Sequence, residues 1–363
     1  MAWEFFNPVR IVAGAGTSRQ LAKHLPPGHY LLLTTAGMVR RGGVAAITGD
    51  AGETYRWTVD TCAPNPQLDA LELQCSRLRE KEYDGIVALG GGSVIDTAKV
   101  LSAVLRNSDT QALSKHLRHG EALDFSRCLP LACMPTTAGT GADVTPFATV
   151  WDRSAKFSLM HTALYPRLTL LDPELTRTLP EQETLHGALD ATSHALETLW
   201  NVNTIPLAGN LAVQALEKIC ANLQGVLDDP DDLEKREALQ VASLYAGLAI
   251  SQNRTAIAHS ISYPLTARYG VPHGLACSFT LAALLELVAR ESAWSFPVPA
   301  SLLLRLKTLF ASLSLGKQVR AYCSDEQVLG LIPEMFNPQR AGNFTISISP
   351  IQVREILDAS LRE

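Results

Sequence analysis

Four residues in the second half of the sequence have the types and spacing of a metal site. Asp190 and His194 are four residues apart, so a helix would present both side chains on one face. His259 and His273 follow later in the chain. Three imidazoles and one carboxylate suit a divalent transition metal such as Fe²⁺ or Zn²⁺. Four protein ligands leave catalysis to an additional position, where a carbonyl oxygen or water would bind, and Fe²⁺ tolerates this more naturally than tetrahedral zinc does.

Each of these residues also has a simpler interpretation. Asp190 and His194 form an ordinary pair at helical spacing, and His273 precedes a glycine in the manner of a helix C-cap. His186 lies four residues before Asp190 on the same expected helix and is the closest competitor for a ligand role. The other five histidines are assigned surface or structural roles.

A glycine-rich loop in the first half is typical of a phosphate site. The apolar run Gly85–Leu89 leads directly into Gly90–Ser93, and a helical pattern follows. Glycines allow a ligand to approach the backbone closely, and the start of the helix presents free N–H groups to an anion. A diphosphate is the ligand that this arrangement predicts. The spacing is not that of the ordinary Rossmann fingerprint, and a tight strand-to-helix turn is the alternative.

A second loop, Pro135–Asp143, follows another apolar run and is rich in hydroxyl groups and small residues. Such residues suit contacts with phosphate and ribose, although Thr and Asp also begin helices as N-caps. Two loops of this kind at consecutive strand ends favour a nucleotide site at the carboxyl edge of a sheet.

The elements that must position these residues differ between the two halves. Short apolar runs alternate with helical patterns in the first half, which predicts a largely parallel sheet covered by helices, in a Rossmann-like α/β dinucleotide-binding domain. The expected strands are 30–34, 85–89, 129–134 and 168–171, and the expected helices are 68–81 and 95–105.

The second half is expected to be all-helical, with helices at 185–200, 207–223, 234–250 and 275–289 and an ambiguous strand at 344–348. We place the two domains at 1–179 and 180–363.

Composition limits the classes of partner. The chain has 363 residues, with 31 Lys plus Arg against 36 Asp plus Glu, so the formal net charge is −5. This predicts no binding to nucleic acid or to anionic membranes. The seven Cys form no CxxC motif, and the first residues do not resemble a secretory signal, so we expect free thiols and a cytoplasmic protein. The apolar stretch 279–289 is shorter than the about 20 residues that span a bilayer.

Taken together, these motifs resemble those of the iron-containing (group III) alcohol dehydrogenases. GGGSVIDTAK, PTTAGTGAD and GALDATSHALE are similar to three motifs of that family, and His259 and His273 have the spacing of its last two metal ligands. The resemblance implies a dehydroquinate synthase-like architecture with catalysis in a cleft between an N-terminal dinucleotide-binding domain and a helical domain. It implies the metal ligands Asp190, His194, His259 and His273. It also implies the cofactor contacts Asn65, Gly91, Gly92, Ser93, Thr136, Thr137, Thr140, Thr145 and Lys156.

One departure from the family pattern concerns the cofactor. Members that prefer NAD usually carry an Asp after the second strand, where this chain has Thr35. An Asp carboxylate would repel a 2′-phosphate and a hydroxyl would not, so we expect NADPH to be accepted and even preferred over NADH. Arg40 and Arg41 follow closely, and a solvated helix face is the simplest role for them.

A second departure concerns the substrate. Tyr263 replaces a His that many members carry four residues after the third ligand, and AHSISYPLTARYGVPHG is most similar to the phosphonoacetaldehyde reductase (hydroxyethylphosphonate dehydrogenase) branch. Arg254, if helical, would lie near the metal and bind a phosphonate, with an internal salt bridge as the alternative. Tyr263 is a candidate for proton transfer or for a pocket wall, and Phe147 is a candidate for a pocket wall.

These implications predict reduction of an aldehyde to a primary alcohol, with phosphonoacetaldehyde as the leading substrate and a small molecule as the only partner apart from a second subunit in a homodimer. Maleylacetate reductase and a broad-specificity primary alcohol dehydrogenase are alternatives within the same class. A dehydroquinate synthase-like lyase and a catalytically inactive binding protein are alternatives from other classes.

Overall fold

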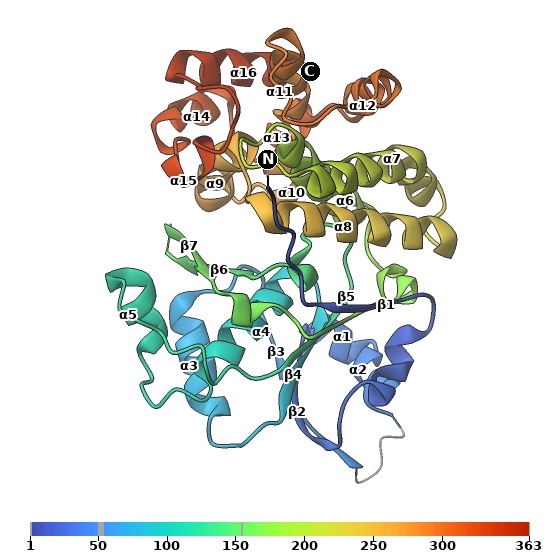
Figure 1. The fold of residues 1–363 in the computed structure, drawn as a ribbon, viewed down its shortest axis with the longest axis vertical. Coiled ribbons are helices and arrows are strands. Elements are labelled where there is room, and N and C mark those ends of the chain that lie inside the picture. Colours follow the sequence, from blue (N-terminus) through green and yellow to red (C-terminus); the bar gives the residue numbers. More distant parts are fainter. Residues whose placement is uncertain (1, 50–53, 154, 363) are drawn as a thin grey trace. The chain divides into compact units, whose positions relative to one another are not determined.

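The computed structural model describes residues 2–49, 54–153 and 155–362, which form two compact units. The α/β unit comprises Asn7–Thr137 and Ala142–Leu179, and the helical unit begins at Pro180 (Figure 1). Two short segments from the first half belong to the helical unit by their contacts, namely the segment that ends at Phe6 and the loop Ala138–Gly141.

A six-stranded sheet forms the centre of the α/β unit, and its neighbouring strands are all parallel. Its order is β1-β8-β5-β4-β2-β3, from the strands β1 (Arg10–Ala13), β2 (Gly28–Thr34), β3 (Tyr55–Thr61), β4 (Gly85–Gly90), β5 (Leu131–Pro135) and β8 (Leu168–Leu171). The inner strands β4 and β5 are buried along their whole length, because helices cover both faces of a parallel sheet. The expectation of a largely parallel sheet is confirmed.

Helices and one hairpin complete this unit. The helices are α1 (Ala36–Arg40), α2 (Gly43–Thr48), α3 (Leu68–Leu78), α4 (Gly92–Val104) and α5 (Ala112–His119), and β6 (Phe147–Asp152) pairs with β7 (Ala155–Met160) in an antiparallel hairpin. Sequence analysis missed β1, β3, β6 and β7. The reason is that these strands are partly exposed and mix polar with apolar residues, whereas the strands found are continuous apolar runs.

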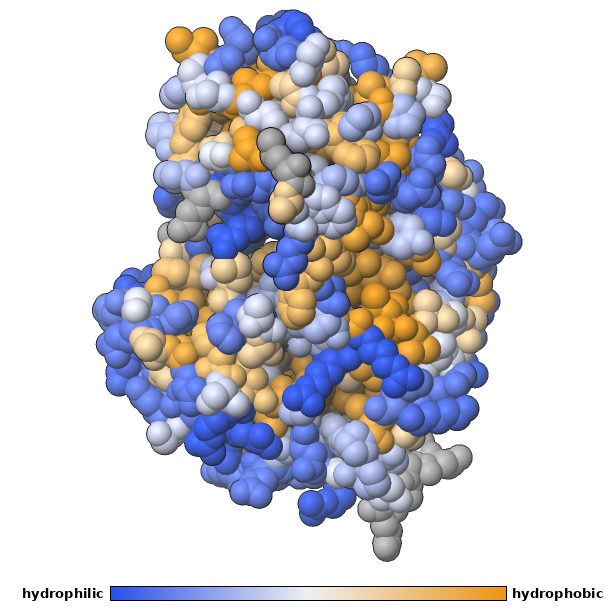
Figure 2. All heavy atoms as spheres, viewed as in Figure 1, coloured by the Kyte–Doolittle hydropathy of each residue, from blue (hydrophilic) through white to orange (hydrophobic). Residues whose placement is uncertain are grey.

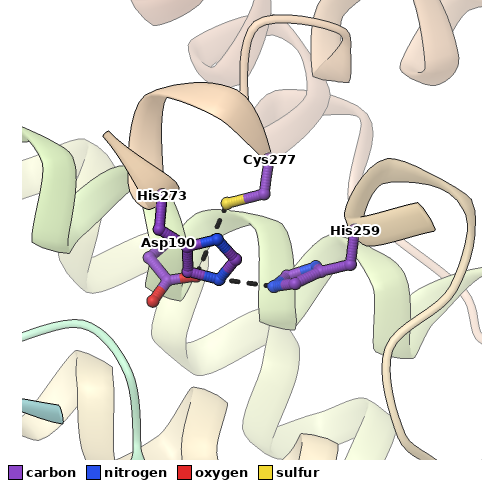
Figure 3. Close-up of side chains that lie close together, drawn as sticks. All are labelled: Asp190, His259, His273 and Cys277. Carbon is purple, nitrogen blue, oxygen red and sulfur yellow. Dashed lines mark hydrogen bonds and ion pairs between the residues drawn. The ribbon is translucent and has the colours of Figure 1, made fainter. Parts of the chain in front are cut away.

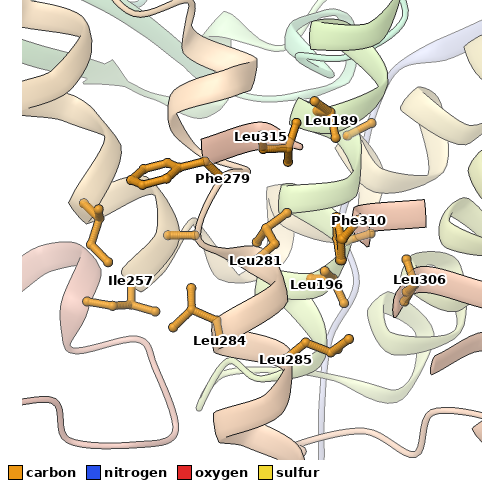
Figure 4. Packing of buried hydrophobic residues seen from close by; sticks show 14 of the residues in the cluster. Leu189, Leu196, Ile257, Phe279, Leu281, Leu284, Leu285, Leu306, Phe310 and Leu315 are labelled. Carbon is orange, nitrogen blue, oxygen red and sulfur yellow. The ribbon is translucent and has the colours of Figure 1, made fainter. Parts of the chain in front are cut away.

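The helical unit encloses one large hydrophobic core (Figure 4). Its first helices are α6 (Glu181–Leu199), α7 (Pro206–Asp228), α8 (Leu233–Asn253), α9 (Ile257–Tyr269), α10 (His273–Ala276) and α11 (Leu281–Arg290). The remaining helices are α12 (Ala300–Leu313), α13 (Leu315–Val319), α14 (Asp325–Gly330), α15 (Pro338–Ala341) and α16 (Pro350–Arg362). In Figure 4, leucines of α6 and α11 face one another across this core.

Two expectations for the helical unit are wrong. The predicted helix 275–289 is divided into α10 and α11, because the backbone turns out of the helix after Ala276. The ambiguous strand 344–348 is a single bridge between Phe344 and Asn201, and the residues that follow form no ladder.

Residues His273–Arg290 are apolar enough and long enough to pass a simple test for a membrane span, but 67% of that window is buried inside the folded unit. The segment is therefore explained by the helical core. Figure 2 shows hydrophobic residues on the visible face gathered in patches that hydrophilic residues border. Scattered exposed apolar residues are normal on folded proteins.

One buried lysine links α4 to the hairpin that follows the second loop. The side chain of Lys99 is fully buried, and its Nζ donates to the carbonyl oxygens of Thr145 and Phe147, each at 2.7 Å. Asp96, one turn earlier on α4, accepts a hydrogen bond from the backbone N–H of Thr149 at 2.9 Å. These two charged side chains fix the backbone that carries Phe147.

We expect Lys99→Met to lower the free energy of unfolding by about 3 kcal/mol, because two buried carbonyl groups would lose a charged donor and Asp96 would lose a nearby cation. Lys81→Met is the matched control, since Lys81 is exposed and should change stability by less than about 0.5 kcal/mol. Urea unfolding followed by circular dichroism measures both. Equal midpoints for the two variants would contradict the organising role of Lys99.

Candidate metal centre

The helical unit gathers the four predicted metal ligands around one carboxylate oxygen. Asp190 Oδ1 lies 3.6 Å from Nε2 of His194, 3.6 Å from Nε2 of His259 and 3.9 Å from Nε2 of His273. Asp190, His194 and His259 are buried, and His273 is about one-third exposed. Figure 3 shows His259 and His273 approaching Asp190 from different helices. The sequence therefore identified side chains that the fold brings together.

Three helices supply these side chains. Asp190 and His194 face the same way on α6, as their spacing of four predicts, while His259 lies in the first turn of α9 and His273 begins α10. Helix α10 approaches α6 closely because Gly274 has no side chain: a Cβ there would lie 1.9 Å from the carbonyl oxygen of His186. Gly274 is thus the residue that lets His273 reach Asp190.

The charges of this cluster fit a divalent cation. Burial acts against ionisation of Asp190 and Glu197, yet the surrounding imidazoles hold the pKa of both carboxyls below their usual values. Burial lowers the pKa of His194, which favours its neutral form. Burial acts against a charge on His259 as well, but the carboxylates of Glu197 and Asp190 raise its pKa to about 9, so a proton on His259 offsets part of their negative charge. A divalent metal would displace this proton and balance both carboxylates.

An unsatisfied nitrogen points to the same conclusion. His259 Nε2 is buried and has no hydrogen-bond partner among the residues that the structure describes, since Asp190 Oδ1 lies 3.6 Å away. Buried polar atoms almost always have a partner, so an exception requires an explanation. A metal ion bound by His259 Nε2 and Asp190 Oδ1 provides one, and the donor set fits a transition metal.

Glu197 is a buried residue of this cluster that sequence analysis did not single out. It is fully buried on α6, and its two carboxylate oxygens accept hydrogen bonds from His259, one from the ring Nδ1–H at 2.7 Å and one from the backbone N–H at 3.0 Å. The available signal was its spacing, since Glu197 lies seven residues after Asp190 and thus on the same helical face.

Cys277 is a second residue that the sequence did not single out. Its Sγ lies 3.5 Å from Asp190 Oδ1, and its ligand atom is within 4.8 Å of those of Asp190, His259 and His273 (Figure 3). The thiol therefore competes with His194 for the fourth ligand position. Among the described residues, neither the predicted ligand His194 nor its competitor His186 is a member of this group.

Tyr263 lies beside the metal cluster, whereas Arg254 is an exposed residue at the end of α8. The ring of Tyr263 lies edge-on to that of His259, with ring centroids 6.5 Å apart, so it lies beside the cluster. Arg254 is not helical: it ends α8 with φ 61° and ψ 166° and is exposed. The helical position considered for Arg254 from the sequence is wrong, because α8 ends at Asn253.

The carboxyl ends of β2, β4 and β5 lie side by side along one edge of the sheet, and the predicted cofactor residues Thr35, Gly91–Ser93 and Thr136–Thr137 follow directly after them. Strand order reverses between β2 and β4, which is where open α/β sheets bind nucleotides. Gly91 caps α4, and Gly92 and Ser93 form its first turn, whose N–H groups suit an anion. The backbone of Gly91 contacts Thr137, since a Cβ there would lie 3.1 Å from Thr137 Cγ2.

Three further predicted cofactor residues, Asn65, Thr145 and Lys156, each contact a different part of the α/β unit. The backbone N–H of Asn65 donates to Ser93 Oγ at 3.1 Å, so these two residues are brought together. Thr145 is buried, and its hydroxyl accepts a hydrogen bond from Lys99, which gives it a structural role. Lys156 lies over the ring of Trp151, with Nζ 5.7 Å from the ring centroid.

The second loop is divided between the two units. Thr136 and Thr137 are half-buried residues of the α/β unit, whereas Thr140 lies in the segment that belongs to the helical unit. Gly139 packs against Gly187 of α6, because a Cβ on Gly139 would lie 2.6 Å from the carbonyl oxygen of Gly187. Phe147 is half-buried at the start of β6.

Comparison with known proteins identifies the class that this fold and this cluster define. Residues 8–173 match the family described as iron-containing alcohol dehydrogenase, and residues 184–315 match the C-terminal domain of the Fe-containing alcohol dehydrogenase family. The two matches together cover more than half of the chain. The chain belongs to the iron-containing alcohol dehydrogenase family, which confirms the resemblance stated from its motifs.

Individual relatives extend this comparison. The chain is 36% identical over 223 residues to phosphonoacetaldehyde reductase of Streptomyces viridochromogenes, a match that covers 60% of this chain and 56% of that protein. It is 30% identical over 296 residues to a probable NADH-dependent butanol dehydrogenase 2 of Bacillus subtilis, covering 76% and 73% of the two chains. The fold is similar to that of sulfoacetaldehyde reductase from Bifidobacterium kashiwanohense in complex with NAD⁺, with a TM-score of 0.86, 24% identity and coverage of 100% and 98%.

We expect His194, and not Cys277, to be the fourth ligand, because a thiolate beside Asp190 and Glu197 would leave one buried negative charge in excess. The Co²⁺-substituted protein should therefore lack the intense near-ultraviolet band of a thiolate bound to Co²⁺. His194→Ala should lower Co²⁺ affinity, and Cys277→Ser should leave it within about a factor of three. A near-ultraviolet band that disappears in Cys277→Ser would show the opposite assignment.

Proposed function

We propose that this chain is a metal-dependent, NAD(P)H-linked reductase that converts an aldehyde to a primary alcohol. The observation that carries the proposal is the convergence of three imidazole Nε2 atoms on Asp190 within 3.9 Å. Membership of the iron-containing alcohol dehydrogenase family supports the reaction class and favours Fe²⁺ over Zn²⁺ as the metal. The residues that would hold the metal are Asp190, His194, His259 and His273.

A bound divalent metal supplies Lewis-acid polarisation of the substrate carbonyl, and the reduced nicotinamide supplies the hydride. The protein's own residues orient the substrate and shield it from solvent. Asp190, His194 and His259 are buried, and burial strengthens the electrostatic contacts among them. Tyr263 lies edge-on to His259, where its hydroxyl is a candidate for carrying the proton that completes the alcohol.

The substrate that we favour is phosphonoacetaldehyde, because a relative that is 36% identical is a phosphonoacetaldehyde reductase. A phosphonate needs a cation, and Arg254 is in the same unit as the metal cluster, five residues before His259. Its backbone is held in a rare conformation by Asn201, whose side-chain amide donates to the carbonyl oxygens of Asn253 and Arg254 at 3.2 and 3.0 Å. Conformations of this kind cost about 1–3 kcal/mol and cluster at functional sites.

An aldehyde panel tests the proposal. The metal-loaded protein should oxidise NAD(P)H with phosphonoacetaldehyde at a higher kcat/KM than with maleylacetate, sulfoacetaldehyde, lactaldehyde or butanal. Arg254→Ala should raise KM for phosphonoacetaldehyde at least about tenfold and leave KM for butanal within about a factor of two, since a charged hydrogen bond contributes about 1.5–3 kcal/mol. A preference for butanal would favour a broad-specificity alcohol dehydrogenase, and no oxidation with any aldehyde would reject the proposal.

Thr35 supports the use of NADPH. It caps α1, and its Oγ1 accepts from the backbone N–H of Met38 at 3.1 Å. A Cβ on Gly37 would lie 3.1 Å from Arg41 Nη1 and 3.7 Å from Thr35 Oγ1, so the Arg41 guanidinium and the Thr35 hydroxyl both lie beside Gly37. A cation next to a hydroxyl suits a 2′-phosphate, whereas a carboxylate at that position would repel it.

We therefore expect Thr35→Asp to move cofactor preference toward NADH. The ratio of kcat/KM for NADPH to that for NADH should fall at least about tenfold, which is the effect of roughly 1.4 kcal/mol of charge repulsion. Thr35→Asn is the matched control, because it has the same size without the charge and can still cap α1. A strong preference of the wild-type protein for NADH, or an equal ratio in both variants, would contradict this assignment.

A further inference from the structure

Glu197 is not one of the predicted metal ligands, but both oxygens of its buried carboxylate accept hydrogen bonds from one of them, His259. Its Oε2 accepts from the ring Nδ1–H of His259 at 2.7 Å, and its Oε1 accepts from the backbone N–H of the same residue at 3.0 Å. The Glu197 side chain is fully buried, and the His259 side chain is 3% exposed. One carboxylate thus holds both the backbone and the ring of a predicted ligand.

The backbone contact has a local cause. Helix α9 begins at Ile257, and its N-cap is Ala256, which has no side chain that could accept from the first turn. The first N–H groups of a helix have no partners within the helix and attract negative charge. Glu197 on α6 supplies the missing acceptor. Its hydrogen bond with the backbone N–H of His259 therefore stabilises the first turn of α9 and positions His259.

The ring contact has a chemical consequence. A neutral imidazole carries its proton on one nitrogen, and a hydrogen bond from Nδ1–H to a carboxylate leaves the lone pair on Nε2. His259 Nε2 is a buried atom without a hydrogen-bond partner in the described part of the chain, and it lies 3.6 Å from Asp190 Oδ1. Carboxylates that bind the outer nitrogen of a metal-ligating His typically fix its tautomer and orientation.

We propose that Glu197 is a positioning residue of the metal centre, which locks His259 in the tautomer and the orientation that present Nε2 to the metal. The inference rests on the proposed metal site, but it requires no particular aldehyde or nicotinamide cofactor. It predicts that affinity for the metal depends on Glu197 although Glu197 does not bind the metal.

Glu197→Gln is the sharpest variant. Glutamine has nearly the same shape but only one side-chain oxygen, so it cannot accept from both the backbone N–H and the ring Nδ1–H of His259. An amide NH₂ facing Nδ1 would favour the tautomer with the proton on Nε2, which cannot bind a metal. Glu183→Gln is the matched control, since Glu183 is an exposed acid in the first turn of the same helix.

The test measures Zn²⁺ affinity by competition with a chelator, after circular dichroism has shown that each variant is folded. Glu197→Gln should bind Zn²⁺ about 10- to 100-fold more weakly than the wild-type protein, and Glu183→Gln should bind it equally well. Affinity of Glu197→Gln equal to that of the wild-type protein would overturn the inference and leave the proposed reductase function standing.

A second measurement needs no variant and stays decisive if Glu197→Gln does not fold. Nitrogen-15 NMR of the zinc-loaded wild-type protein should show His259 bound through Nε2, with an Nδ1–H proton that exchanges slowly with water. Coordination through Nδ1, or a rapidly exchanging Nδ1–H, would overturn the inference. If this signature is present and no aldehyde is reduced, the positioning role holds and the proposed function fails.

Discussion

The need to neutralise the buried carboxylate of Asp190 is the constraint on which the helical unit depends. An isolated charge at 3% exposure would be very costly, and the fold meets that cost by directing three imidazoles at one carboxylate oxygen. The neighbouring carboxylate of Glu197 adds a second negative charge. A divalent metal is the simplest group that satisfies both carboxylates and the unpartnered Nε2 of His259 at once.

The same constraint explains the close packing of the helices. Gly274 allows α10 to touch the backbone of α6 at His186, and Gly139 packs against the backbone of the next residue of α6, Gly187. Glu197 then ties the start of α9 to α6. The α/β unit uses a similar device, since Lys99 is a single buried charge that organises the backbone around Thr145 and Phe147. In both units a charged side chain positions residues distant in sequence.

Sequence reasoning reached the parts of the site that local spacing encodes. The interval of four between Asp190 and His194 identifies one helical face, and the glycines after β4 identify an anion site. His259 and His273 were connected to that face by resemblance to a family, because no local rule brings together residues from three helices. Glu197 was missed for a related reason: its contacts with His259 depend on where α9 begins, and the break between α8 and α9 at Arg254 is a tertiary feature. The strands β3 and β6 were missed because polar and apolar residues are mixed along them, which resembles a loop.

The central claim is that Asp190, His194, His259 and His273 hold one catalytic metal ion. Anomalous X-ray diffraction at the iron edge, on crystals of protein reconstituted with Fe²⁺ under anaerobic conditions, tests it most directly. The account predicts one anomalous peak per chain, within bonding distance of Asp190 and of Nε2 of each of the three histidines. A peak bonded to Cys277 in place of His194, or no peak at this cluster, would contradict it.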